Sequence, residues 1–263
     1  KATQYAKENG LYVCFFPIDF SRAPLEWVLD MLKKVATEGH MDSLAIVDTF
    51  GGLAPHTVPH LIKKMREVFS DTPFEPHFHD DFGMGVANTL MAMAEGCQVA
   101  QTSVTGLGER AGNAALEEVI MAIETRQDLL GVSTNVDTRQ IYRTSRLVSD
   151  ITGFPVQPNK AIVGANAFRH ASGIHQDGIL KERTTYEVMD PKSIGWPGNV
   201  LVLGKLSGRA GLRSRLESLG YILSRDELDT AFESFKMLAD KKREVTDRDL
   251  EALMAEERRV VME

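Results

Sequence analysis

The chain has 263 residues, with 30 Lys and Arg against 37 Asp and Glu, which gives a formal net charge of -7. Its apolar fraction of 43% and charged fraction of 25% exclude an intrinsically disordered protein. The negative charge argues against general nucleic-acid binding, and no apolar run approaches the roughly 18 residues of a membrane span. With two isolated cysteines, Cys14 and Cys97, and no secretory signal, we expect a cytoplasmic protein.

Residues 1–9 are typical of the tail of a helix that ends at Gly10, so we expect the chain to begin inside a larger protein. Four units then follow in which a short apolar run precedes an amphipathic helix with a period near 3.6. The apolar runs cover residues 11–16, 43–48, 74–79 and 98–104. Alternation of this kind predicts a parallel sheet with helical crossovers.

A complete barrel needs eight such units in about 250 residues, whereas this pattern stops near Leu130. We therefore expect an α/β fold that forms the C-terminal half of a TIM (β/α)8 barrel, with four βα units, followed by small, mostly helical subdomains. An open, doubly wound sheet is the alternative.

Three domains are expected, since the repeat stops and Pro, Gly and Asn become frequent after Gly131. They are a partial barrel at 1–130, a linking subdomain at 131–192 and a C-terminal helical subdomain at 193–263. Within the last two we expect a helix at 134–148 and a short strand at 200–203. Ser224 with Glu227 predicts a capping box at the start of another helix, and Thr246 opens a shorter one.

The third apolar run ends in His77 and His79, whose side chains point to the same face of an extended strand. Two imidazoles on one face can chelate a divalent cation. Asp80 and Asp81 follow directly and can accept hydrogen bonds from the other ring nitrogens. An isolated pair of this kind is more often chance or polar capping. The metal interpretation is nevertheless favoured over chance, because further polar residues fall at the same strand ends, namely Asp19, Asp48 and Thr49.

Two glycine-rich stretches carry further candidates. In the loop 106–113, Asn113 is a natural N-cap for the next helix, and its amide oxygen can also face a metal. His175 lies between glycines in residues 172–178, where a histidine is more often merely exposed than catalytic.

Five motifs occur in order along the chain: HFHDDFG at 77–83, GLGERAGNAALEEV at 106–119, PVQPNKAIVGANAF at 155–168, SGIHQDG at 172–178 and GKLSGR at 204–209. Together they resemble the metal-dependent acyl-CoA condensing enzymes of the DRE-TIM family, on the branch of the 2-isopropylmalate, homocitrate and citramalate synthases. The resemblance covers nearly the whole chain.

The resemblance implies a Claisen-type condensation of acetyl-CoA, the co-substrate, with a 2-oxoacid. It also implies a divalent metal (Zn, Mn or Mg) and a homodimer with subdomain exchange. By the same resemblance His77 and His79 are metal ligands, Asn113 is a further or water-bridged ligand, and Thr49 helps to hold the 2-oxoacid carboxylate. His175 and Tyr186 look like the catalytic pair, which this family presents from the partner subunit.

The first strand of the resembled family carries an arginine and an aspartate metal ligand. Neither can be assigned to a residue of this sequence. We expect the fragment alone to be inactive and either to aggregate or to depend on a partner, since half a barrel leaves open sheet edges and an uncovered core.

Three positions depart from the family pattern. Ile18 replaces a usual glutamate and cannot transfer a proton, Asp80 stands where asparagine is usual, and Leu206 replaces a histidine. Because of Ile18, a non-catalytic metal- or ligand-binding paralogue stays open as an alternative. A lyase on the same barrel is a further alternative, although it would be expected to carry a cysteine in the loop 106–113, which has none.

Overall fold

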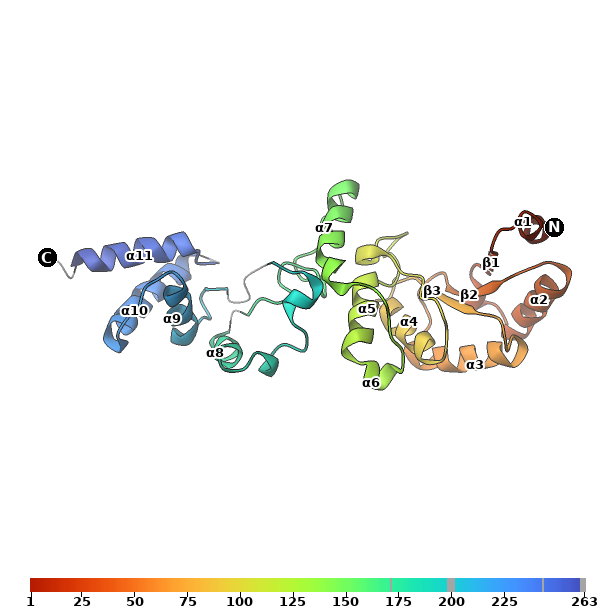
Figure 1. Ribbon diagram of the computed structural model, residues 1–263, viewed down its shortest axis with the longest axis horizontal. Helices are drawn as coiled ribbons and strands as arrows, with labels where there is room; N and C mark the ends of the chain where they lie inside the picture. Colours follow the sequence, from red (N-terminus) through yellow and green to blue (C-terminus); the bar gives the residue numbers. More distant parts are fainter. Residues whose placement is uncertain (171, 198–201, 243, 261–263) are drawn as a thin grey trace. The chain divides into compact units, whose positions relative to one another are not determined.

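The computed structural model describes residues 1–170, 172–197, 202–242 and 244–260 (Figure 1). They form two compact units. Unit 1 comprises Lys1–Val156 and Ala161–Val163, and unit 2 comprises Gln157–Lys160 and Gly164–Glu263. This division does not test whether 131–192 and 193–263 fold separately, so the three predicted domains stay a prediction. None of the described helices is long and apolar enough to cross a membrane.

Unit 1 is built on a parallel sheet with the strand order β1-β2-β3, which agrees with the predicted α/β class. Its strands are β1 (Cys14–Phe15), β2 (Ser43–Asp48) and β3 (Phe74–Phe78). Every residue of β2 is buried, as expected for a parallel strand that is covered on both faces. The register sets Val47 opposite His77, so β2 and β3 end together.

Amphipathic helices alternate with these strands, and α2, α3 and α4 pack in succession along the sheet (Figure 1). Their buried stripe meets Leu44, Ile46 and Phe74 in one core. Each fully buried side chain of this size contributes roughly 1.5–3 kcal/mol. The helices of unit 1 are α1 (Ala2–Glu8), α2 (Leu25–Glu38), α3 (Val58–Val68), α4 (Gly85–Ala94), α5 (Leu116–Thr125), α6 (Gln127–Leu130) and α7 (Ile141–Thr152).

The predicted fourth strand at 98–104 is wrong in detail, because this segment lies beside β3 without forming a regular strand. The Gln98 N–H donates to the Phe74 carbonyl (3.1 Å), and the Gln101 N–H donates to the Pro76 carbonyl (3.0 Å). Three residue steps in the segment 98–101 therefore span two residue steps in β3, and this mismatch interrupts the ladder of hydrogen bonds between them. The segment nevertheless holds the side chain of Gln101 next to β3.

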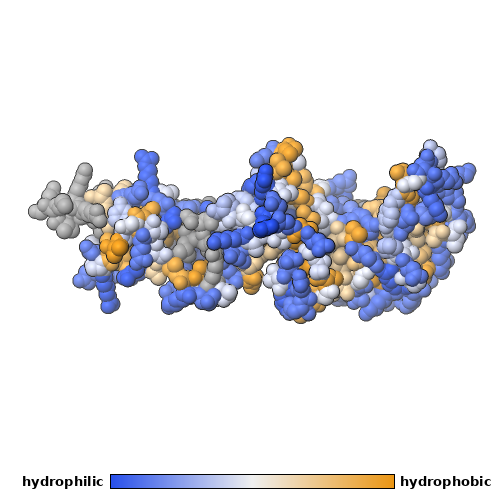
Figure 2. Space-filling view, in the orientation of Figure 1, coloured by the Kyte–Doolittle hydropathy of each residue, from blue (hydrophilic) through white to orange (hydrophobic). Residues whose placement is uncertain are grey.

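The predicted helix at 134–148 begins later and ends later than expected, since residues 138–140 form a 3-10 turn before α7. One side of α7 and the residues after it expose Leu147, Ile151 and Phe154. Figure 2 shows this concentration of hydrophobic surface along α7.

Unit 2 contains α8 (Gly173–Lys181), α9 (Arg209–Ser218), α10 (Arg225–Lys241) and α11 (Asp247–Val260). Its core centres on the buried side chains of Leu212, Leu216, Phe235 and Leu250. Of the predicted strand at 200–203, residues 200 and 201 lie outside the described residues, and Leu203 forms an isolated bridge with Val245.

The predicted capping box at the start of α10 is confirmed. Ser224 Oγ accepts from the Glu227 N–H (3.3 Å), and Glu227 Oε2 accepts from the Ser224 N–H (2.7 Å). Thr246 opens α11 in the same way, with Asp249 as its partner.

Candidate active site

His77 and His79 lie on one face of β3 and its extension, as the alternation of a strand predicts. Their ring centroids are 5.3 Å apart with 73° between the ring planes. His79 is 9% exposed, and His77 is partly buried with Phe16 at its ring edge (5.5 Å). The two imidazoles are therefore adjacent and screened from much of the solvent.

An acceptor holds the Nδ1 atom of each ring. His77 Nδ1 lies 3.0 Å from Gln101 Oε1, and His79 Nδ1 lies 3.1 Å from the Gly112 carbonyl oxygen. A carbonyl oxygen can only accept, so in each neutral ring Nδ1 carries the proton and Nε2 keeps its lone pair. This is the tautomer in which a histidine binds a metal through Nε2.

Burial lowers the pKa of His77, an effect that the Gln101 hydrogen bond opposes and the neighbouring His79 reinforces. A lowered pKa favours the neutral ring, the form that can act as a ligand. Within the described ranges, no group of three or more His, Cys, Asp and Glu side chains is arranged to hold a metal. The donors present are thus two imidazoles with an amide nearby, which fit part of a site for a borderline cation such as Zn²⁺.

Asp80 and Asp81 do not hold the imidazoles, so that expectation was wrong. Asp80 Oδ1 accepts from the Gly85 N–H (2.7 Å) at the start of α4, where a carboxylate is favoured by the unpaired N–H groups of the helix. Asp81 accepts two hydrogen bonds from Arg110 (2.8 and 3.1 Å), and these lower the pKa of its carboxyl. Both carboxylates therefore accept hydrogen bonds from other donors and not from the imidazole rings.

Asn113 reaches the pair from the glycine-rich loop, with Nδ2 3.4 Å from His77 Nε2. The prediction that Asn113 is the N-cap of α5 is wrong, because the cap is Ala115 and makes no side-chain hydrogen bond. Gly112 makes the approach possible. Its φ is +92°, and a Cβ there would collide with the Gly106 carbonyl oxygen.

Thr49 follows β2 at the same edge. Its Oγ1 accepts from the Asp19 N–H (2.7 Å), which leaves its own hydroxyl hydrogen free to donate. Asp48, by contrast, is buried and accepts from Ser21 Oγ (2.9 Å) and the Leu53 N–H (2.7 Å). Asp48 therefore holds the loop in shape, and Thr49 is the residue that can offer a hydrogen bond to a ligand.

His175 and Tyr186, both in unit 2, are brought together as the predicted pair. Their rings stack with centroids 4.3 Å apart and planes inclined by 29°. Gly178 permits this contact, because a Cβ at its position would run into the Tyr186 ring. His175 is exposed, so its ring is accessible to a substrate.

Two glutamines that the sequence did not single out support these sites. Gln101 holds His77, and the sequence carries no local signal for this contact, because 98–104 does not form a regular strand. Gln176, adjacent to His175, is fully buried and donates to the His170 carbonyl (2.8 Å) and the Val202 carbonyl (2.9 Å). In this way α8 is fastened to the segment that precedes α9.

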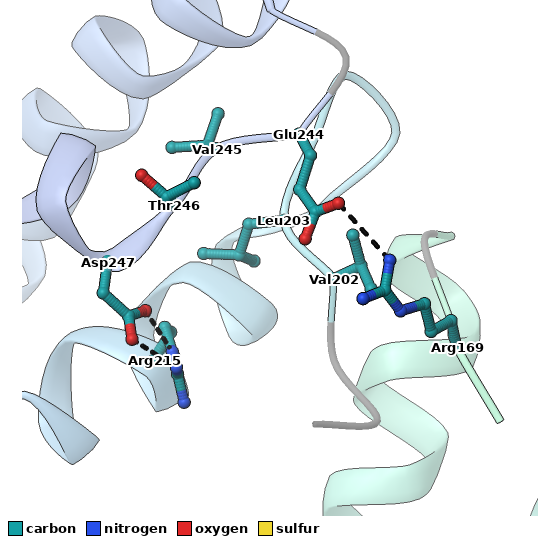
Figure 3. Close-up of a pocket in the computed structure, with 8 residues that line it drawn as sticks. All are labelled: Arg169, Val202, Leu203, Arg215, Glu244, Val245, Thr246 and Asp247. Atoms are coloured by element: carbon teal, nitrogen blue, oxygen red, sulfur yellow. Dashed lines mark hydrogen bonds and ion pairs between the residues drawn. The ribbon is translucent and has the colours of Figure 1, made fainter. Parts of the chain in front are cut away.

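A separate cavity of about 190 Å³ lies within unit 2 (Figure 3). Its two arginines are both paired with carboxylates: Arg215 with Asp247 (2.7 and 2.6 Å) and Arg169 with Glu244 (3.3 Å). Because these charges compensate one another, the cavity lacks the free cations that an anionic ligand would require.

Comparison with protein-family models gives two matches. The model described as HMGL-like matches residues 1–148, and the model described as homocitrate synthase post-HMGL domain-like matches residues 162–243.

Among solved structures, hydroxymethylglutaryl-CoA lyase from Pseudomonas aeruginosa is 20% identical, with a TM-score of 0.51 over 59% of this chain and 54% of that one. This likeness concerns the fold alone. Together with the HMGL-like match it confirms a partial barrel followed by a helical subdomain.

Curated relatives match over the full chain. The 2-isopropylmalate synthase of Carboxydothermus hydrogenoformans is 49% identical over 265 residues, covering 100% of this chain and 52% of the relative. That of Nitrosococcus oceani is 51% identical over 260 residues, covering 97% of this chain and 51% of the relative. The chain thus spans about half the length of the curated relatives it matches.

Proposed function

The chain belongs to the HMGL-like family, and from that premise we propose that the complete protein condenses acetyl-CoA with a 2-oxoacid. The proposed 2-oxoacid is 3-methyl-2-oxobutanoate and the product is 2-isopropylmalate, a step of leucine biosynthesis, because the relatives at 49% and 51% identity bear that name. The observation that carries the proposal is the pair His77 and His79, in which an acceptor holds each Nδ1 atom and Nε2 is left as the atom that can bind a cation.

The residue roles follow from the donors present. His77 and His79 would hold a divalent cation. Asn113 would join them, directly or through water, once its side-chain amide turns its oxygen toward the cation, because Nδ2 is the atom that faces His77 Nε2. What a cation supplies when bound there is Lewis-acid polarisation of the 2-oxoacid carbonyl. Thr49 donates its hydroxyl hydrogen to the 2-oxoacid carboxylate, since its oxygen is already held by the Asp19 N–H. The metals proposed are Zn, Mn or Mg.

The proton transfer is assigned to His175. It removes a proton from the acetyl methyl group, and the electron pair left on that carbon forms the new bond to the carbonyl carbon of the 2-oxoacid. The π electron pair of that carbonyl moves onto its oxygen, which takes up a proton to give the hydroxyl group of the product. Stacking on Tyr186 orients the His175 ring. Water then cleaves the thioester and releases the CoA thiol, which makes the condensation irreversible. A homodimer in which the partner subunit presents this pair, as the resembled family does, is part of the proposal.

A cytoplasmic location is likewise proposed. Its support is that Cys14 and Cys97 are both free thiols in the structure, as expected of a reducing compartment.

The test is a thiol-release assay on the full-length protein with acetyl-CoA, a divalent metal and three 2-oxoacids. Release that depends on 3-methyl-2-oxobutanoate supports the proposal. Dependence on 2-oxoglutarate or pyruvate would instead indicate a homocitrate or citramalate synthase. The match of residues 162–243 to the post-HMGL domain supports a synthase over a lyase.

A non-catalytic metal- or ligand-binding paralogue is the second candidate, and Ile18 is the observation that favours it. Its side chain is 78% exposed on the loop after β1 and can neither accept a proton nor form a hydrogen bond. Stoichiometric metal binding, without release of thiol from acetyl-CoA in the presence of any of the three 2-oxoacids, would establish this candidate. Recovery of release in Ile18→Glu would then identify the cause.

A further inference from the structure

A row of hydrogen bonds leads from His77 to a buried carboxylate and hydroxyl in unit 1. Gln101 Oε1 lies 3.0 Å from His77 Nδ1, and Gln101 Nε2 donates to Glu75 Oε2 (2.8 Å). The other carboxylate oxygen, Glu75 Oε1, accepts from Ser43 Oγ (2.5 Å). Ser43 is fully buried and Glu75 is 8% exposed, so water has little access to this end of the row, whereas Gln101 and His77 are partly buried.

The direction of every hydrogen bond in this row follows from its buried end. A carboxylate can only accept, so the amide group of Gln101 must turn its NH2 toward Glu75 and its oxygen toward His77. His77 must then donate from Nδ1 and keep the lone pair on Nε2. The amide nitrogen of Asn113, 3.4 Å from His77 Nε2, faces that lone pair as a donor should.

We propose that Glu75 and Gln101 are positioning residues that hold His77 in the Nδ1–H tautomer and so keep Nε2 available to a divalent cation. This inference rests on the proposed function for the metal, but it assigns roles to two residues outside the ligand set.

The free-energy cost of burying the Glu75 carboxylate supports a functional role for the row. A carboxylate is unfavourable in a buried strand, and in the part of the chain that the structure describes no Lys or Arg pairs with Glu75. The hydrogen bonds from Ser43 Oγ and Gln101 Nε2 offset the burial only in part. A neutral side chain of the same size would fill the same volume, but it would not determine which way the amide group of Gln101 points.

His79 serves as an internal reference. Its Nδ1 faces the Gly112 main-chain carbonyl, which cannot reverse its polarity. Changes at Glu75 or Gln101 should therefore alter the tautomer of His77 and leave that of His79 unchanged.

The test uses Glu75→Gln in the full-length protein. A glutamine can turn either its NH2 or its oxygen toward Gln101. The amide of Gln101 can then present either its oxygen or its NH2 to His77. Ring-nitrogen NMR of the metal-free protein should show one His77 tautomer in the wild type and a mixture in the variant. The affinity for Zn²⁺, measured by competition with a chelating dye, should fall by about tenfold or more.

Ser43→Ala is the matched control. It removes a hydrogen bond from the same carboxylate but leaves the polarity of the row intact, so the single tautomer should persist and Zn²⁺ should bind with wild-type affinity. If Glu75→Gln does not fold, Gln101→Met takes its place, since methionine has a similar volume and offers His77 only a weak sulfur acceptor instead of an amide oxygen.

An unchanged His77 tautomer, or an unchanged Zn²⁺ affinity, in the folded variant overturns the inference. If the wild-type protein releases thiol while the variant keeps its His77 tautomer or its Zn²⁺ affinity, the proposed function stands and only the inference about Glu75 and Gln101 fails. Conversely, a wild type without thiol release refutes the proposed function, while the tautomer measurement still tests the row.

Discussion

The ring of His175 stacks on the ring of Tyr186, with centroids 4.3 Å apart and planes inclined by 29°. Stacking limits rotation of the imidazole, which a group that removes a proton from carbon requires.

We expect His175→Ala in the full-length protein to lower thiol release by about 100-fold or more, because the proton acceptor is lost. Tyr186→Phe keeps the stacked ring and should lose less. Steady-state release rates with saturating acetyl-CoA check both variants. Near-normal turnover of His175→Ala would remove His175 from the mechanism.

Removal of metal should abolish thiol release. Dialysis against a chelator is expected to stop release, and Zn²⁺, Mn²⁺ or Mg²⁺ added back singly should restore it to different extents. His77→Ala and His79→Ala should each weaken metal binding, since each deletes a proposed ligand. His60→Ala, which changes an exposed histidine on α3, is the control and should bind metal normally. Equal affinity in all three variants would contradict the metal site.

Gly112→Ala should destabilise unit 1 more than Gly131→Ala does. Both glycines have positive φ, +92° and +64°, so an alanine costs about 1–2 kcal/mol of strain at either position. At Gly112 the new Cβ also meets the Gly106 carbonyl, whereas at Gly131 nothing lies within 4 Å. Thermal unfolding of the two variants, compared with the wild type, measures the difference. An equal loss in both would show that the loop adapts to the added atom.

Stability should depend on Asp249 in a defined pH range. The Lys242 side chain, with Thr246, lowers the pKa of Asp249 to about 2 in the folded state. A lowered folded-state pKa stabilises the protein above the unfolded pKa, near 3.9, and this stabilisation is lost as the pH falls toward 2.

The difference in Tm between the wild type and Asp249→Asn should therefore be full above about pH 4 and shrink between pH 4 and 2. Lys242→Met removes the main cause and should flatten this dependence. A difference that stays constant across the range would show that Asp249 acts through packing alone.

Several features of the fold and of the site were predictable because they are local. The alternation of a strand predicted that His77 and His79 share a face, and their rings are indeed adjacent. The capping box of Ser224 and Glu227 spans three residues and formed as expected. In both cases the backbone geometry of one element determines the contact.

Other features were not predictable, because several partners compete for one side chain. Asp80 and Asp81 follow the histidines directly, yet the N-terminus of α4 and the guanidinium of Arg110 hold them instead. The fourth run, at 98–104, has an apolar pattern, but an extra residue opposite β3 interrupts its ladder.

The sequence by itself determined the alternating βα units, the family and the histidines, because periodicity and motif order are properties of neighbouring residues. Only the tertiary structure decided what holds those histidines. Gln101 lies 24 residues from His77, and Asn113 lies 36 residues from it. Such pairs meet only when the crossover helices bring adjacent strands together, and a hydrogen bond then forms with whichever donor or acceptor the packing leaves within about 3 Å.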